Sequence, residues 1–205
     1  MPEDVEAAGG LAVLHQELLR RGEADQVARG QLDSHSPTSQ QWRRVTEVDN
    51  DNTEFLAGVV DRVGWPGTGL VGSAAAHAAW LIAQHAPAEF RARWLPLLAA
   101  TVDAEDVVAV RDHAYLADRV ATDMRRPQRW GTQSLCFPGA GCRLYPLDDA
   151  AGVNTRRRSI GLDPLPEIDL NAAYPSYASI DAARRMSTSD RSVAGSRERD
   201  PPMPS

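Results

Sequence analysis

The stretch AWLIAQHA, residues 79–86, places Gln84 and His85 in a run of Ala, Trp, Leu and Ile. Together with the residues before it, this stretch predicts a helix from Ser73 to His85, ended by Pro87, that is apolar on almost every side. Such a helix is buried over most of its surface, so both polar side chains need partners inside the protein. The 100° step of a helix puts Gln84 on the side of His77 and His85 on another side.

Apolar residues at three- and four-residue steps predict further helices around this one. The first covers about residues 4–33, with possible breaks at its glycines, and the others begin near Asp51, Glu89 and Val110. The chain has no internal repeat and no convincing run of alternating strand residues. We therefore expect an all-α fold, a compact bundle of about five to six helices with an irregular C-terminal arm and a disordered tail.

Changes in composition suggest how the chain is divided. The segment LDSHSPTSQQ has the Ser, Pro and Asp content of a linker. The segment after residue 125 is rich in Gly and Pro, and the last residues are rich in Ser, Arg, Asp and Pro and cannot supply a core. The prediction is an N-terminal helix at 1–34 packing on the core, a linker at 35–48, a core domain at 49–172 with a long loop at 125–147, and a disordered tail at 173–205.

The charge balance limits the class of partner. The net charge is -6 and the isoelectric point about 5.4, so no overall positive field attracts nucleic acid or an anionic membrane surface. The longest weakly polar run falls short of the ~20 apolar residues that a membrane span needs. The first ten residues carry acids and do not look like a secretory signal. We expect a soluble cytoplasmic protein whose partner is a small molecule or another protein.

The residue types also exclude some chemistry. All 22 basic residues are Arg, because the chain contains no Lys. This excludes Schiff-base catalysis, a lysine-anchored pyridoxal phosphate and a phosphate-loop lysine, and no cofactor is predicted. Cys136 and Cys142 are too few for a disulfide scaffold and too isolated for a structural zinc site. They are predicted to be ordinary loop thiols, with a local disulfide as the alternative.

Five short motifs occur together along the chain: ADQVAR at 24–29, VGWPGTGLVG at 63–72, AWLIAQHA at 79–86, AYLADRV at 114–120 and RPQRWGTQ at 126–133. In this combination the chain resembles a bacterial domain family of unknown function, common in actinobacteria and myxobacteria. Members of that family share Asp-Gln, Gly-Trp-Pro, Gln-His, Asp-Arg and Gly-Thr-Gln motifs in this order. The resemblance covers about residues 11–170 and implies a helical fold, but no established activity.

The resemblance also marks polar positions. Here they fall on Asp25, Gln26, Arg29, Asp49, Asn52, Gln84, His85, Asp118, Arg119, Gln128, Thr132 and Gln133. His77 and His113 match no motif of the family. The chain departs from the family at SLCFPGAGCRL, residues 134–144, which looks like an insertion, and in its long Ser- and Arg-rich tail.

His85 with Asp118 is the pairing that could support acid–base catalysis, because a carboxylate on one imidazole nitrogen raises the basicity of the other. Asp118 could instead form an ion pair with Arg119, and His85 could be a core histidine bonded to a main-chain carbonyl. Arg side chains could bind an anionic substrate group, Gln side chains could supply neutral hydrogen bonds, and a Trp could stack on the ligand or simply pin the loop. The candidate ligand-binding residues are Gln26, Arg29, Gln84, Arg119, Trp130 and Gln133.

A metal site would use His77, His85, His113 and Asp118. His77 and His85 lie eight residues apart, roughly 12 Å along a regular helix, so both cannot bind one ion, and no metal is predicted. The favoured function is a polar small-molecule site between helices, with His85 and Asp118 as catalytic candidates. The alternative is a non-catalytic protein-interaction, immunity or regulatory module, in which the same residues form a buried hydrogen-bond network that specifies the fold.

Overall fold

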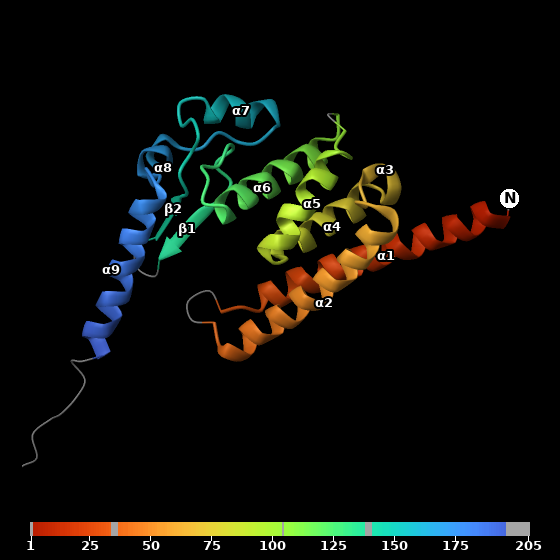
Figure 1. The fold of residues 1–205 in the computed structure, drawn as a ribbon, viewed down its shortest axis with the longest axis horizontal. Helices are drawn as coiled ribbons and strands as arrows, with labels where there is room; N and C mark the ends of the chain where they lie inside the picture. Colours follow the sequence, from red (N-terminus) through yellow and green to blue (C-terminus); the bar gives the residue numbers. More distant parts are fainter. Residues whose placement is uncertain (1, 34–36, 104, 138–140, 196–205) are drawn as a thin grey trace, which may run out of the picture.

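The computed structural model describes residues 2–33, 37–103, 105–137 and 141–195, and this part of the chain is mostly helical with one small sheet (Figure 1). Two long helices, α1 (Pro2–Gly30) and α2 (Ser39–Val63), run antiparallel along one side. The short helix α3 (Thr68–Val71) leads into α4 (Ser73–His85), which is followed by α5 (Ala88–Ala99) and α6 (Val107–Asp123). The predicted helical fold is confirmed in outline.

Helix α4 is the central element. It packs against α1, α2, α3, α5 and α6, as expected for a helix that is apolar on almost every side. Its Ala79 and Ile82 join a core with Leu56, Trp94 and Leu116. Burial of these side chains supplies most of the driving force for folding.

Helix α1 is continuous, although its glycines predicted possible breaks. A Cβ atom at Gly22 would lie 2.9 Å from the Cβ of Ala78 on α4. The glycine therefore lets two helices approach closely, and the packing that results offsets its low helix propensity.

The predicted linker at 35–48 is wrong for most of its length. Thr38 caps α2: its Oγ1 accepts from the Gln41 N–H at 3.2 Å, and Gln41 Oε1 accepts from the Thr38 N–H at 2.7 Å. This reciprocal capping box is a Thr-x-x-Gln signal that starts the helix at Ser39. The acidic residues near Asp51, which suggested the start of the helix, lie inside it. Residues 35 and 36 of the predicted linker, and residue 34 before it, fall outside the described residues.

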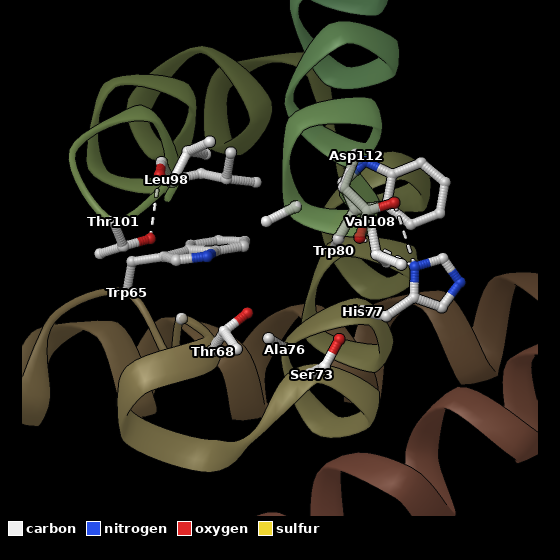
Figure 2. Close-up of a pocket in the computed structure, with 13 residues that line it drawn as sticks. Trp65, Thr68, Ser73, Ala76, His77, Trp80, Leu98, Thr101, Val108 and Asp112 are labelled. Carbon is white, nitrogen blue, oxygen red and sulfur yellow. Dashed lines mark hydrogen bonds and ion pairs between the residues drawn. The ribbon is translucent and has the colours of Figure 1, made fainter. Parts of the chain in front are cut away.

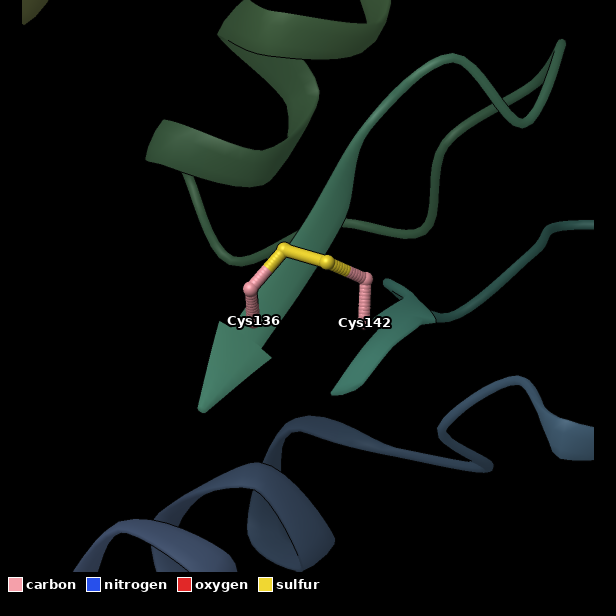
Figure 3. Close-up of a disulfide and its surroundings, with 2 residues drawn as sticks. All are labelled: Cys136 and Cys142. Carbon is pink, nitrogen blue, oxygen red and sulfur yellow. A yellow bond between two sulfur atoms is a disulfide. The ribbon is translucent and has the colours of Figure 1, made fainter. Parts of the chain in front are cut away.

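The long loop of residues 125–147 contains strands that the sequence analysis did not predict. β1 (Ser134–Phe137) and β2 (Gly141–Leu144) form an antiparallel pair in which Cys136 lies opposite Cys142. A disulfide joins these two cysteines across the strands (Figure 3). The prediction of free thiols is therefore wrong, and the disulfide alternative holds. Such short strands carry too little periodicity to be distinguished from a loop.

The chain continues through α7 (Val153–Ser159), α8 (Glu167–Ala172) and α9 (Tyr177–Gly195), and α8 packs against β2 (Figure 1). Tyr174 is 4 % exposed and Ile180 is fully buried, so the predicted disordered tail does not begin at residue 173. Helix α9 is also held by the Arg125–Asp181 ion pair at 2.6 Å and by the hydrogen bond that the Tyr177 hydroxyl donates to Arg126 O at 2.8 Å. Residues 196–205 of the predicted tail lie outside the described residues. None of the helices in the described ranges is both long and apolar enough to cross a membrane.

Candidate functional site

Three helices bring a carboxylate and an imidazole together. Asp25 lies near the end of α1 and His85 in the last turn of α4, and Asp25 Oδ1 is 2.8 Å from His85 Nδ1. The Asp25 side chain is 1 % exposed, whereas that of His85 is 23 % exposed. Asp49 of α2 completes what we term the Asp25–His85 centre: Asp25, Arg29, Asp49 and His85.

Arg29 connects the members of this centre. Its Nη2 donates to Asp49 Oδ1 at 2.6 Å and lies 3.4 Å from Asp25 Oδ1. Its Nε is 3.0 Å from His85 Nδ1. Gln26 donates from Nε2 to the other Asp25 oxygen at 2.8 Å. The predicted residues Gln26, Arg29 and His85 are therefore brought together, with two carboxylates that the sequence-based hypothesis did not assign to His85.

The two contacts of His85 Nδ1 exclude each other, because one ring nitrogen cannot donate to Asp25 and accept from Arg29 at once. If Nδ1 carries the proton and donates to Asp25, Nε2 keeps its lone pair and can act as a base. If Nδ1 accepts from Arg29, Nε2 carries the proton and can only donate. The chemistry of the centre thus depends on the imidazole tautomer.

The same residues could hold a metal ion. One ligand atom each from Asp25, Asp49 and His85 lies within 4.8 Å of the others. Two carboxylates and an imidazole would suit a divalent cation. However, the guanidinium of Arg29 already contacts all three residues, so a metal would have to displace it.

Asp118 has a different role from the one predicted for it. Its carboxylate accepts from the main-chain N–H groups of Arg129, Trp130 and Thr132 at 2.7 to 3.1 Å and from the Thr132 hydroxyl at 3.0 Å. Asp118 is 1 % exposed, and burial raises the pKa of its carboxyl group against the opposing effect of these hydrogen bonds. Asp118 anchors the loop, and its partners are these loop groups rather than His85.

The other predicted loop residues surround this anchor. Gln133 is 6 % exposed, and its Nε2 donates to the Thr132 hydroxyl at 3.0 Å. The Trp130 ring lies edge-on to His113, with centroids 6.2 Å apart. Gln128 is fully buried, and its side chain bonds to the main chain of Gln133 on both its oxygen and its nitrogen. These contacts stabilise the loop conformation.

Gln84 and Arg119 carry buried polar atoms without partners. Among the described residues, Gln84 Oε1 and Arg119 Nε have no hydrogen-bond partner. The offset of 35 residues between His77 and Asp112 recurs in the Trp80–Tyr115 ring contact, and it also relates Gln84 to Arg119. The constant offset means that α4 and α6 run parallel. Gln84 and Arg119 therefore lie at the same height along the two helices.

Arg119 is also close to other cations. Burial, together with the guanidinium groups of Arg91 and Arg29, lowers the pKa of Arg119. Arg91 is neutralised by a two-point ion pair with Asp123, and Arg29 by Asp49. Since an unpartnered buried donor costs about 1 to 3 kcal/mol, Arg119 is the cation in this region that would gain most from an anionic ligand.

A second His–Asp pair lies at the other end of α4. His77 Nδ1 is 2.8 and 3.0 Å from the two oxygens of Asp112 on α6, and its ring stacks on Trp80 (Figure 2). The pair borders a cavity of about 20 Å³ between α3, α4, α5 and α6, which has room for about one water molecule. The hydrogen bond to Asp112 raises the pKa of His77, and burial raises the pKa of Asp112.

This pair predicts a pH-dependent contribution to stability. Because the pKa of His77 is raised in the folded state, the ion pair stabilises the fold below about pH 6.5 and loses that effect as the pH rises through the folded value. His77 is 42 % exposed, so we expect a screened contribution of about 0.5 to 1 kcal/mol. Urea unfolding at pH 5.5, 7 and 8.5 should show that Asp112→Asn destabilises the protein more at pH 5.5 than at pH 8.5. Equal destabilisation at all three pH values would contradict a pH-dependent His77–Asp112 ion pair. The other histidines are present in both proteins and so do not contribute to the difference between them.

Sequence reasoning missed two residues of the Asp25–His85 centre. Asp25 is four residues before Arg29, and the ion pair typical of that spacing exists at 3.4 Å, but the carboxylate is buried and also contacts His85. Asp49 is marked in the sequence only as a polar position. The available signal was the segment ADQVAR at 24–29, which places an acid beside the candidate residues Gln26 and Arg29.

The fold and the centre define a helical protein that carries a buried carboxylate–imidazole pair bridged by an arginine. The chain belongs to a family of unknown function, DUF6624, whose model matches residues 12–175. No curated protein and no solved structure matches the chain.

Proposed function

We propose that the Asp25–His85 centre is the acid–base part of a small-molecule site between α1, α4 and α6, and that the protein acts on its ligand by proton transfer. The observation that carries this proposal is the 2.8 Å contact between a buried carboxylate and a partly exposed imidazole. In this arrangement the carboxylate orients the ring, and the other ring nitrogen can meet a ligand.

The proposed step uses the tautomer in which His85 Nδ1 donates to Asp25. His85 Nε2 then takes a proton from an O–H, N–H or acidic C–H group of the ligand. The imidazolium that forms is stabilised by the adjacent Asp25 carboxylate, and Nε2 returns the proton to the product. Arg29 and Asp49 hold this geometry through the ion pair at 2.6 Å.

Two buried polar groups without partners, one on α4 and one on α6, support the presence of a ligand beside the Asp25–His85 centre. Gln84 Oε1 is an acceptor and Arg119 Nε is a donor, and neither has a partner within the described part of the chain. A ligand with an anionic group and a hydrogen-bond donor would satisfy both. Gln84 and Arg119 are therefore proposed as binding residues, whereas Trp130 and Gln133 are proposed only to shape the loop beside the site.

The alternative is a non-catalytic interaction, immunity or regulatory module. It is favoured by Arg29, which already gives His85, Asp25 and Asp49 partners inside the protein. In that case the centre only joins α1, α2 and α4, and its loss lowers stability.

The thermal midpoint of His85→Ala separates the two functions. Because Arg29 Nη2 lies 3.4 Å from the same Asp25 oxygen, the buried carboxylate keeps a charged partner when the imidazole is removed. The proposed site therefore predicts a midpoint within about 2 °C of the parent protein. A fall of about 5 °C or more would favour the structural network. The control is His77→Ala, which removes the other aspartate-bonded histidine of the same helix.

Nitrogen NMR of histidine-labelled protein tests the chemistry directly. We expect neutral His85 to carry its proton on Nδ1, and we expect its Nε2 resonance to move when a binding compound is found among small carboxylic acids, phosphate esters and amides. Arg119→Gln should abolish that shift. A neutral His85 with its proton on Nε2 would contradict the proposed base.

A further inference from the structure

A second cavity lies away from the Asp25–His85 centre and shares no residue with it. It has a volume of about 380 Å³ and opens between α6, the hairpin, α7 and α8. This size is within the range of small-molecule sites. Its lining includes the Gly-Thr part of the Gly-Thr-Gln motif, which the proposed function does not use.

The wall of this cavity is fixed by local structure. Gly131 has φ = 65°, and a Cβ atom there would lie 2.7 Å from Leu165 Cδ1. Thr132 is held by Asp118, and the opposite wall includes Cys142 of the disulfide-bonded hairpin. Glycine is required at the turn, and the surrounding anchors keep the cavity in shape without a ligand.

Arg157 supplies a buried cation to the lining. It is 8 % exposed, its Nε donates to Asp163 O at 2.6 Å, and its Nη1 donates to Trp130 O at 2.7 Å and more weakly to Gly131 O. These partners are main-chain carbonyls, and within the described residues no carboxylate forms an ion pair with Arg157. Burial lowers the pKa of Arg157, against the opposing effect of the nearby Tyr115, Asp118 and Asp163 side chains.

Arg143 of β2 places a second guanidinium in the same lining, over the ring of Tyr174 at 4.3 Å. Tyr115 and Ser134 add hydroxyl groups, and Asp169 adds one carboxylate. Two cations against one anion leave the lining of the described residues net positive. Hydroxyl and guanidinium donors together match the oxygen atoms of a carboxylate or phosphate.

We propose that this cavity is a binding site for a small molecule with a carboxylate or phosphate group, which Arg157 and Arg143 bind. Leu165 and Gly131 offer an apolar surface to the rest of the ligand, and Asp169 accepts a hydrogen bond from an ammonium or hydroxyl group on it. The inference does not depend on the proposed function of the Asp25–His85 centre.

Titration calorimetry with inorganic phosphate and, separately, acetate at constant ionic strength tests the site and distinguishes the two anionic groups. We expect saturable millimolar binding of at least one probe, weakened about tenfold or more by Arg157→Gln and by Arg143→Gln. Arg158→Gln is the matched control, because this exposed residue is the next arginine of α7 and carries the same charge. It should bind as the parent protein does.

The folded state of each variant is checked by its thermal midpoint. If Arg157→Gln is unstable, Arg157→Lys keeps the charge but loses the planar fork, and Arg143→Gln provides the independent measurement. Absence of saturable binding of both probes to the parent protein would overturn the proposal. Equal weakening of binding by Arg158→Gln would mean that the anion responds only to surface charge, and it would also overturn the proposal. Loss of binding in Arg119→Gln alone would overturn it too, because the anion would then bind at the Asp25–His85 centre.

Discussion

Asp118→Ala is expected to lower the free energy of unfolding by about 3 to 5 kcal/mol, because it leaves several buried donors without an acceptor. The carboxylate accepts from three main-chain N–H groups and the Thr132 hydroxyl, all at 2.7 to 3.1 Å. No water can replace a group that is 1 % exposed without opening the loop. Since about 1 kcal/mol shifts the midpoint of a chain of this length by 2 to 4 °C, the midpoint should fall by roughly 10 °C.

The matched control for this change is Asp61→Ala. Asp61 forms an ion pair with Arg93 at 2.6 Å, but the two side chains are more than half exposed. Its removal should cost less than about 1 kcal/mol. If Asp118→Ala and Asp61→Ala have the same effect on urea unfolding, Asp118 is not the anchor of the loop. Loss of the loop should also weaken anion binding in the cavity lined by Gly131 and Thr132.

Trp94→Ala is expected to cost about 3 to 5 kcal/mol, through lost burial and the cavity that remains. Trp94 of α5 is fully buried and packs against Phe90 and Trp65, with ring centroids 5.1 and 6.5 Å away. It connects the turn before α3 to the core around α4. The surrounding helices are held by other contacts and cannot collapse fully into the space.

Trp42→Ala is the control for Trp94→Ala. Trp42 is 51 % exposed on α2, so its truncation removes a similar volume but little buried surface. We expect a change within about 0.5 kcal/mol. Both variants are compared by urea unfolding followed by circular dichroism, and similar midpoints for the two would show that α5 is not part of the cooperative core.

The sequence predicted the elements whose signals are local and repeated. Helix α4 was predicted from Ser73 to His85 with the observed bounds, because an apolar stretch between a glycine turn and a proline leaves few alternatives. The predicted start of α2 is wrong, although the Thr38 to Gln41 capping box is also a local signal, because the Ser and Pro residues around it are typical of a linker. The hairpin was missed since four-residue strands carry too short a pattern.

Half of the Asp25–His85 centre consists of predicted site residues, and the partner predicted for His85 differs from the one in the structure. Three of the predicted residues, Gln26, Arg29 and His85, lie in or beside one centre, while Asp118 serves the loop. Within α1, Asp25 and Arg29 are four residues apart, a spacing that gives an ion pair of little energetic value on an exposed helix face. Burial at 1 % exposure makes the same carboxylate the partner of a histidine 60 residues away.

Residue types and periodicity predict a helical protein built around α4, exclude lysine chemistry and require internal partners for the polar groups near His85. These properties need only a few turns of chain. The packing of distant segments brings Asp25 rather than Asp118 to His85, joins Cys136 to Cys142 and places Arg157 in the lining of a cavity. Each of these depends on which helices and strands pack together, and hydrogen bonds between distant residues leave no regular spacing in the sequence.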